Sequence, residues 1–249
     1  MTVQVRAGTS VADLHETLLA AGQRTGLPER GGTVGGALVA GENDIRALGR
    51  GRLRESLLQV RYVSAEGRVI NSGGPTVKNV SGFDLPRLMV GSLGTLGLVA
   101  EVILRTNPIP AVSRWFRCDE ASPTAVVEAV LAPSAVLHDG TSTWVELEGH
   151  EPDVDAELAR LASVGPFEPV ASGPDLPPFR WSLSPAEVLS IDSAATGDYV
   201  AAVGLGLAFA SEPQPQRVVS AAVLEIGERI KTNFDPTGRL NPGRNPANK

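Results

Sequence analysis

The stretch GSLGTLG, residues 91–97, lies between the short apolar segment LMV and the apolar run LVAEVIL. Within it, three glycines alternate with small polar residues and leucines. Glycine has no side chain, so it lets the backbone approach a neighbouring group closely. This composition predicts a backbone segment packed against a neighbour or a ligand that leaves no room for side chains.

A second glycine cluster, GGTVGG, occupies residues 31–36. Closely spaced amides and a threonine hydroxyl predict a backbone nest able to hold phosphate oxygens. Neither cluster matches the dinucleotide fingerprint GxGxxG or the Walker pattern, because no Gly-Lys-Ser/Thr occurs and the strand–turn–helix context is absent. One cluster alone could serve only turns. Two clusters, each beside apolar structure, favour a ligand.

The order of elements predicts an α+β fold. Up to Pro110 we expect a strand, a helix that begins at Ser10, a turn-rich region, a hairpin around Glu66-Gly67, and a strand after the glycine stretch. Beyond Pro110, the order strand, helix, two strands, helix resembles a split β-α-β unit. We then expect a proline-rich loop at 165–187, one strand at 199–209 and a final helix at 216–234.

Composition restricts the function classes. The 249 residues carry a net charge of −6 without a long basic stretch, which argues against a nucleic-acid partner. No apolar run reaches the roughly eighteen residues of a membrane-spanning helix, and no secretory signal is visible, so we expect a cytoplasmic protein without a transmembrane segment. One cysteine, Cys118, allows no internal disulfide and no iron–sulfur cluster held by this chain alone. The three scattered histidines predict no metal site.

Several segments resemble a known family. These are GGTVGGALVAG, GRGRLRESLLQVRYVSAEGRVINSGG and TVKNVSGFDLPRLMVGSLGTLGLVAEVILR, together with the terminal FDPTGRLNPGR. They are similar to the FAD-binding domain of the vanillyl-alcohol oxidase / p-cresol methylhydroxylase (PCMH) superfamily. Within that superfamily, they look most like the FAD-binding subunits of bacterial glycolate oxidases.

The resemblance implies a PCMH-type FAD-binding domain at 1–110, a smaller ferredoxin-like α+β cap domain at 111–215, and a C-terminal helix and tail at 216–249 that return to the first domain. The family begins with a further subdomain that holds its first pyrophosphate loop. Because this sequence starts at the strand after that loop, we expect only the second FAD subdomain here. The chain alone should then bind FAD weakly or not at all, and without a covalent bond.

The resemblance also assigns cofactor contacts. The backbone amides of Gly32, Thr33, Gly35 and Gly36 would meet the pyrophosphate. Residues 91–97 would pass close under the cofactor, and the backbone of Val99 would meet the adenine end. We therefore expect substitution of Gly35 by valine to abolish FAD binding without affecting the fold. The expected cofactor-binding residues are Gly32, Thr33, Val34, Gly35, Gly36, Gly91, Ser92, Gly94, Thr95, Gly97 and Val99. No residue is singled out as a catalytic group.

The function implied is oxidation of a small 2-hydroxy acid to a 2-oxo acid by an FAD-dependent, glycolate-oxidase-like complex. This chain would be an electron-passing or structural subunit, beside a sister FAD-linked oxidase subunit and an iron–sulfur subunit. Such partners would place it at the inner membrane as a peripheral protein. Two alternatives remain open: a flavin-free scaffold subunit, and a truncated reading of a longer FAD-linked oxidase.

Overall fold

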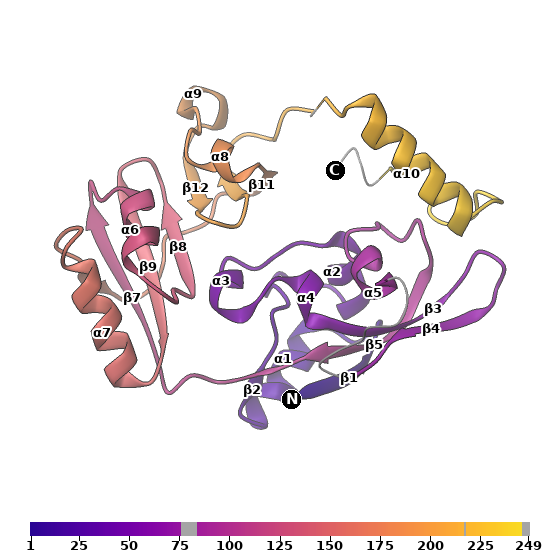
Figure 1. The fold of residues 1–249 in the computed structure, drawn as a ribbon, viewed down its shortest axis with the longest axis horizontal. Helices are drawn as coiled ribbons and strands as arrows, with labels where there is room; N and C mark the ends of the chain where they lie inside the picture. Colours follow the sequence, from indigo (N-terminus) through magenta and orange to yellow (C-terminus); the bar gives the residue numbers. More distant parts are fainter. Residues whose placement is uncertain (76–83, 217, 246–249) are drawn as a thin grey trace. The chain divides into compact units, whose positions relative to one another are not determined.

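The computed structural model describes residues 1–75, 84–216 and 218–245, so the segment TVKNVSGF at 76–83, which carries part of the family resemblance, lies outside the described residues. The chain forms two compact units (Figure 1). Unit 1 comprises Met1–Asp44, Gly51–Ile109 and Gln216–Lys249, and unit 2 comprises Ile45–Arg50 and Pro110–Pro215. The six residues 45–50 thus belong to unit 2, whereas the sequence had assigned them to the first domain.

Unit 1 is built on a four-stranded antiparallel sheet with the order β1-β5-β3-β4 (Figure 1). The hairpin predicted around Glu66-Gly67 joins β3 and β4, and the strand after the glycine stretch is β5, one of the two central strands. Strands β2 and β6 form a separate two-stranded ladder. The strands are β1 (Thr2–Arg6), β2 (Gln23–Arg24), β3 (Leu57–Val63), β4 (Val69–Gly73), β5 (Leu98–Arg105) and β6 (Asn107–Pro108).

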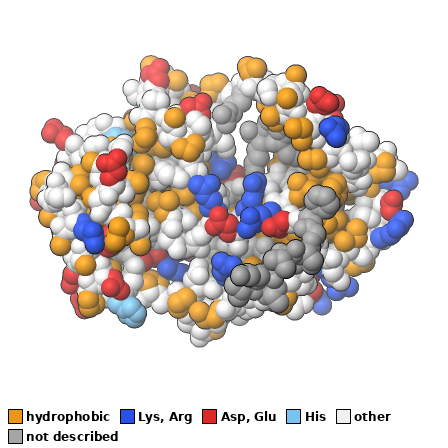
Figure 2. Space-filling model, in the orientation of Figure 1, with side chains coloured by type: hydrophobic (Ala, Val, Ile, Leu, Met, Phe, Trp, Pro, Cys, Tyr) orange, Lys and Arg blue, Asp and Glu red, His pale blue; other side chains and the backbone are white. Residues whose placement is uncertain are grey.

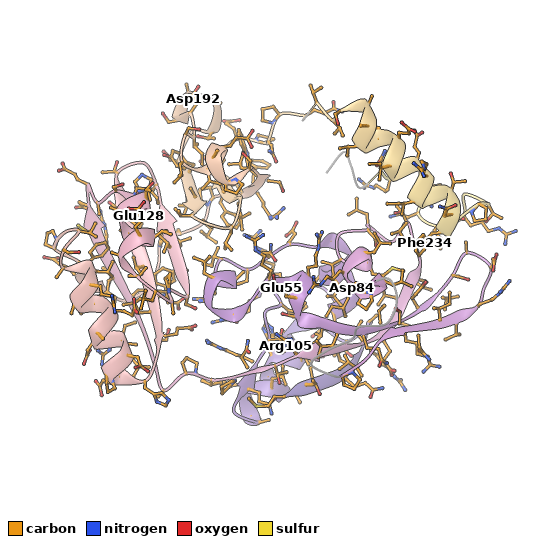
Figure 3. All side chains as sticks on the ribbon, viewed as in Figure 1. Glu55, Asp84, Arg105, Glu128, Asp192 and Phe234 are labelled. Carbon is orange, nitrogen blue, oxygen red and sulfur yellow. The ribbon has the colours of Figure 1, made fainter. Side chains whose placement is uncertain are left out.

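Four of the five described helices of unit 1 begin at a polar side-chain cap; α4 has none. Ser10 starts α1, because its Oγ accepts a hydrogen bond from the amide of Asp13 at 3.0 Å. Asp84 caps α5 in the same way (labelled in Figure 3), and Ser220 caps α10. The helices are α1 (Val11–Ala20), α2 (Val34–Ala40), α4 (Leu53–Ser56), α5 (Leu85–Met89) and α10 (Ala221–Phe234).

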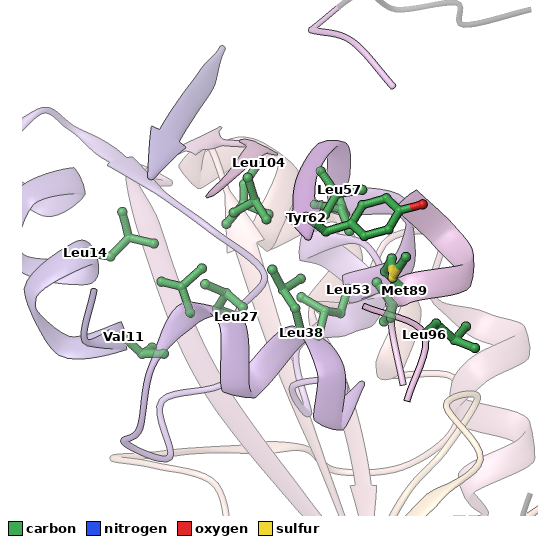
Figure 4. Packing of buried hydrophobic residues seen from close by; sticks show 14 of the residues in the cluster. Val11, Leu14, Leu27, Leu38, Leu53, Leu57, Tyr62, Met89, Leu96 and Leu104 are labelled. Carbon is green, nitrogen blue, oxygen red and sulfur yellow. The ribbon is translucent and has the colours of Figure 1, made fainter. Parts of the chain in front are cut away.

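One apolar core holds unit 1 together (Figure 4). Alternation along β5 turns Val102 and Leu104 inward, where both are almost fully buried. Ile230 and Phe234 of α10 pack against this core, and Phe234 lies in the last turn of that helix (Figure 3). The buried side chains drawn in Figure 4 include Val11, Leu14, Leu27, Leu38, Leu53, Leu57, Tyr62, Met89, Leu96 and Leu104.

Unit 2 contains a seven-stranded antiparallel sheet with the order β10-β7-β9-β8-β12-β13-β11. Its first four strands and two helices follow the order β7-α6-β8-β9-α7-β10, and their arrangement β10-β7-β9-β8 is the ferredoxin-like one, as expected. The elements are α3 (Ala47–Arg50), β7 (Val112–Asp119), α6 (Pro123–Ala129), β8 (Ala135–His138), β9 (Ser142–Gly149), α7 (Glu151–Leu161), β10 (Glu168–Val170), β11 (Phe179–Ser182), α8 (Pro185–Val188), α9 (Ser193–Thr196), β12 (Tyr199–Ala202) and β13 (Leu207–Ala210).

Three local expectations were wrong. The single strand expected at 199–209 is a hairpin, because Gly204 and Gly206 adopt φ of +82° and +68° and reverse the chain between β12 and β13. The proline-rich loop at 165–187 contains β10, β11 and α8. The last helix begins after its cap Ser220 rather than at residue 216.

Candidate cofactor-binding groove

A groove in unit 1 brings together both glycine clusters and the segment after α10. It has a volume of about 530 Å³, within the roughly 300–1,000 Å³ typical of small-molecule sites. We call it the glycine groove. It is lined by Ala7, Gly8, Thr33, Gly35, Gly36, Val39, Gly94, Gly97, Leu98, Val99, Arg239, Leu240 and Asn241.

The first glycine cluster is the start of helix α2 rather than an open loop. The Oγ1 of Thr33 caps the helix by accepting from the Gly36 amide at 3.2 Å. The Gly35 amide donates to the carbonyl of Ala7 at 2.8 Å, and the Val34 amide donates to that of Thr9 at 2.9 Å. Three amides of this cluster therefore already have partners within the chain.

Close backbone approach explains two of the groove glycines. A Cβ on Gly35 would lie 2.7 Å from the Cβ of Ala7, and a Cβ on Gly97 would lie 2.4 Å from Cδ2 of the buried Tyr62. Real Cβ atoms do not come so near other atoms. Valine at Gly35 would therefore disturb the packing of α2 on β1, so this substitution does not separate cofactor binding from folding as the sequence had led us to expect.

The second glycine cluster follows a bent path. Gly91 and Gly94 adopt φ of +83° and +71°, and Leu93 between them has φ of +53°, which is unusual for a residue with a side chain. The Leu93 amide donates to the carbonyl of Val39 in α2, and the Leu93 carbonyl accepts from Nδ2 of Asn241 at 2.5 Å. The cluster is thus held between α2 and the segment after α10.

That segment, residues 235–241, is fixed by the buried carboxylate of Asp235. Its Oδ1 accepts from the Thr237 hydroxyl and from the Arg239 amide, and its Oδ2 accepts from the Leu240 amide. Lys231 completes the set, since its ammonium also donates to Oδ2. The backbone of the groove-lining residues 239–241 is therefore tied to the end of α10.

These hydrogen bonds determine the charge of Asp235. Burial acts to raise the pKa of its carboxyl, but the hydrogen bonds from Lys231, Leu240, Arg239 and Thr237 outweigh burial and hold the pKa below the usual range. Asp235 is therefore ionised at neutral pH, and its role is structural: it holds the segment that lines the groove.

The expected site residues fall into three groups. Six line the glycine groove: Thr33, Gly35, Gly36, Gly94, Gly97 and Val99. Another three line a separate cavity of about 400 Å³ beside α10, namely Gly91, Ser92 and Thr95. The remaining two, Gly32 and Val34, line neither cavity, and Val34 is fully buried in the core of unit 1.

Sequence reasoning missed several residues that line the groove. Gly8 follows β1, and Arg239, Leu240 and Asn241 follow α10, so sequence distance hid their proximity to the glycine clusters. The quoted motif FDPTGRLNPGR was the available signal for the last three. For Gly8, the sequence offered no signal except that a glycine follows a predicted strand.

The residues present suit an extended anionic ligand such as FAD. A Cβ on Gly8 or Gly94 would meet no atom within 4 Å, so open space lies beside these two glycines. Among the described residues that line the groove, Arg239 is the only charged one and none is acidic. Small residues, one cation and apolar flanks such as Val39 and Leu98 fit the phosphates and the rings of a dinucleotide.

Unit 2 contains a separate polar cluster. The Glu146 carboxylate, almost fully buried, accepts from Nε of Arg46 at 2.7 Å and from Oγ of Ser113 at 3.2 Å. Burial raises the pKa of Glu146, and Arg46 opposes this shift. Arg46 also lies over the Trp115 ring, 5.9 Å from its centroid. These contacts attach residues 45–50 to the sheet of unit 2.

On the face drawn in Figure 2, acidic and basic side chains are interspersed among hydrophobic ones. In the described parts of the chain, no helix has the length and hydropathy to cross a membrane. Within the same residues, no group of three or more His, Cys, Asp or Glu side chains is arranged to hold a metal ion.

The α+β fold is of the vanillyl-alcohol oxidase / p-cresol methylhydroxylase type, and its groove suits FAD. Residues 1–73 match the family described as FAD binding domain. Its cofactor is accordingly FAD.

Among curated proteins, the chain is similar to glycolate oxidase subunit GlcE of Escherichia coli (strain K12), with 27% identity covering 98% of this chain and 81% of the relative. It is also similar to glycolate oxidase subunit GlcD of Bacillus subtilis (strain 168), with 28% identity covering 66% of this chain and 37% of that relative. Among solved structures, an alkyldihydroxyacetonephosphate synthase shares the fold with a TM-score of 0.71 at 13% identity, over 98% of this chain and 65% of the synthase.

Proposed function

We propose that this chain is an FAD-binding subunit of a glycolate-oxidase-like complex that oxidises a small 2-hydroxy acid to a 2-oxo acid. The observation that supports this most is the similarity to GlcE, which extends over nearly the whole chain. D-lactate dehydrogenases and a D-2-hydroxyglutarate dehydrogenase also match parts of the chain. The substrates in these names are all 2-hydroxy acids, which supports that substrate class.

In this proposal, unit 1 binds the cofactor and unit 2 is the cap on the substrate side. FAD bound here would supply a redox group through which electrons taken from the substrate by a sister subunit could pass. The chain's own contribution is positional: the glycine walls admit the phosphates, and Asp235 with Lys231 holds the segment that carries Arg239 and Leu240. No described residue is assigned as a catalytic base.

The proposed partners are a sister FAD-linked oxidase subunit, which carries out substrate oxidation, and an iron–sulfur subunit, which takes the electrons onward. With one cysteine, this chain alone cannot hold an iron–sulfur cluster, so electrons that leave it need another carrier. This fits a role in passing electrons or in assembly. Association of the complex with the inner membrane would then come from the partners.

The test is a substitution at Gly8, a groove-lining position at which an added Cβ would meet no atom within 4 Å. Leucine there would narrow the groove without a clash at Cβ. We expect the complex carrying Gly8→Leu to lose one FAD per copy of this chain, while Gly8→Ala retains it and both variants unfold at the wild-type temperature. Full flavin content in the leucine variant would favour the flavin-free scaffold.

Substrate class is tested separately by anaerobic reduction of the bound flavin in the purified complex. We expect glycolate or D-lactate to bleach the visible flavin absorbance, and the corresponding methyl esters, which lack the carboxylate, to leave it unchanged. Bleaching by neither 2-hydroxy acid would contradict the proposed activity.

A further inference from the structure

We propose that Arg239 binds the diphosphate of FAD in the glycine groove. This inference rests on the proposed function, since it takes FAD as the occupant. It goes further by assigning the charge recognition to one side chain that lies outside both glycine clusters.

The first argument is the charge of the groove. Of the described residues that line it, Arg239 alone is charged, and no carboxylate competes for its guanidinium there. A diphosphate carries at least two negative charges at neutral pH, and backbone amides alone supply only partial positive charge. A guanidinium matches phosphate oxygens with two parallel N–H donors.

The second argument is the state of the three amides in the first glycine cluster. Val34, Gly35 and Gly36 donate to Thr9, Ala7 and Thr33, respectively. To donate to a phosphate, each of these amides would have to share its hydrogen between two acceptors or give up its present acceptor within the chain. The cluster thus offers a surface of small residues, and the positive charge comes from Arg239 in the segment after α10.

The third argument is the way in which Arg239 is held. Its amide donates to Asp235 Oδ1 at 3.0 Å, while its exposed side chain has no hydrogen-bond or ion-pair partner within the described chain. Because the Arg239 backbone is already fixed, less conformational entropy is lost when its guanidinium binds an anion. A solvated arginine elsewhere on the surface would not combine a fixed backbone with a glycine-walled groove.

The experiment measures dissociation constants of the full chain for FAD, ADP and riboflavin, in the wild type and in Arg239→Gln. FAD and ADP contain the diphosphate and riboflavin does not. We expect Arg239→Gln to weaken FAD and ADP about tenfold or more, as for loss of a hydrogen-bonded charge, and to leave riboflavin unchanged. Arg239→Lys keeps the positive charge but not the planar guanidinium, so its affinity for FAD and ADP should lie between those of the wild type and Arg239→Gln.

Arg244→Gln is the matched control. Arg244 belongs to the same terminal segment and has the same charge, but it lines the cavity beside α10 and not the glycine groove. We expect it to retain wild-type affinity for all three ligands. Both variants should unfold at the wild-type temperature, which separates lost binding from lost structure.

The outcomes are distinct. If the wild type binds FAD and Arg239→Gln binds it equally well, or if Arg244→Gln weakens binding as much, the assignment of Arg239 is overturned and the proposed function stands. An equal loss of riboflavin affinity in Arg239→Gln would also overturn it, because the diphosphate would not be the group recognised. If the wild type binds neither FAD nor ADP, the proposed function fails and this inference fails with it.

Discussion

The ammonium group of Lys231 lies 2.6 Å from Oδ2 of Asp235, and it also donates to the carbonyls of Thr95 and Leu240 at 2.9 and 2.7 Å. All three donors of the ammonium are therefore used. One lysine thus connects the end of α10, the glycine stretch and the groove-lining segment. Thr95 is buried and the Asp235 side chain is inaccessible to solvent, whereas the Lys231 side chain is 29% exposed.

The first prediction concerns pH. The pKa of Asp235 is lower in the folded protein than its ordinary value of about 3.9. A carboxyl with a depressed folded-state pKa contributes stability above its unfolded pKa and loses it as pH falls toward the folded value. We expect the free energy of unfolding, measured in urea, to drop from about pH 4 downward. Asp235→Asn should be less stable at pH 6 and should show a shallower drop. An equally steep drop in Asp235→Asn would show that other carboxyls cause it.

The second prediction compares two arginines of unit 2. Arg46→Met removes the cation that contacts the Glu146 carboxylate, whose side chain is 3% exposed. Breaking a buried pair costs roughly 3–5 kcal/mol, and the partial exposure of Arg46 places the expected loss near the lower end. Arg114 pairs with Glu151 and Asp155 at the surface, so Arg114→Met should cost less than about 1 kcal/mol. Similar losses in denaturant titrations of both variants would contradict this assignment.

A feature of the fold or the groove could be predicted from the sequence when the residues that form it lie close together in the chain. Local rules predicted the cap at Ser10 and the β3–β4 hairpin, because each depends on residues near one another in the chain. The ferredoxin-like strand order joins distant segments and was expected from the order of elements and the family resemblance. The glycine stretch and Val99 were recognised from composition and from family resemblance. The reversal at Gly204 and Gly206 was missed because apolar residues flank both glycines, so the run reads as one continuous strand.

The groove shows the limit of such reasoning. Thr33 and Gly94 come from the two glycine clusters, but Arg239, Leu240 and Asn241, which also line the groove, lie more than a hundred positions away in the chain. Only tertiary packing brings these segments together. Composition also could not show that the amides of Gly35 and Gly36 are used within the chain, because that depends on where Ala7 and Thr33 lie.

The third prediction tests the cap at Ser10. The Ser10 hydroxyl satisfies an amide in the first turn of α1, a helix that buries Val11, Leu14 and Leu18. Ser10→Ala should lower the free energy of unfolding by about 1 kcal/mol, and Ser10→Asp should retain most of it because a carboxylate also caps helices. Urea titrations would measure both. Equal losses in the two variants would mean that the hydroxyl acts through another contact.

The last prediction separates the two kinds of glycine in the groove. Gly97 is constrained by Tyr62, whose ring is 2% exposed and has no room to retreat. A methyl group at Gly97 would overlap that ring, so Gly97→Ala should cost about 2 kcal/mol of unfolding free energy, in the range for an overpacked core.

Gly8→Ala adds the same methyl group on the same groove, at a position where no atom lies within 4 Å of Cβ. Its effect should stay within about 0.5 kcal/mol, as for a substitution away from packed structure. Thermal and urea unfolding of the two variants without cofactor would give the comparison. If Gly97→Ala proved as stable as Gly8→Ala, the close approach of β5 to Tyr62 would not be the reason for a glycine at position 97, and contact with the cofactor would remain as the explanation.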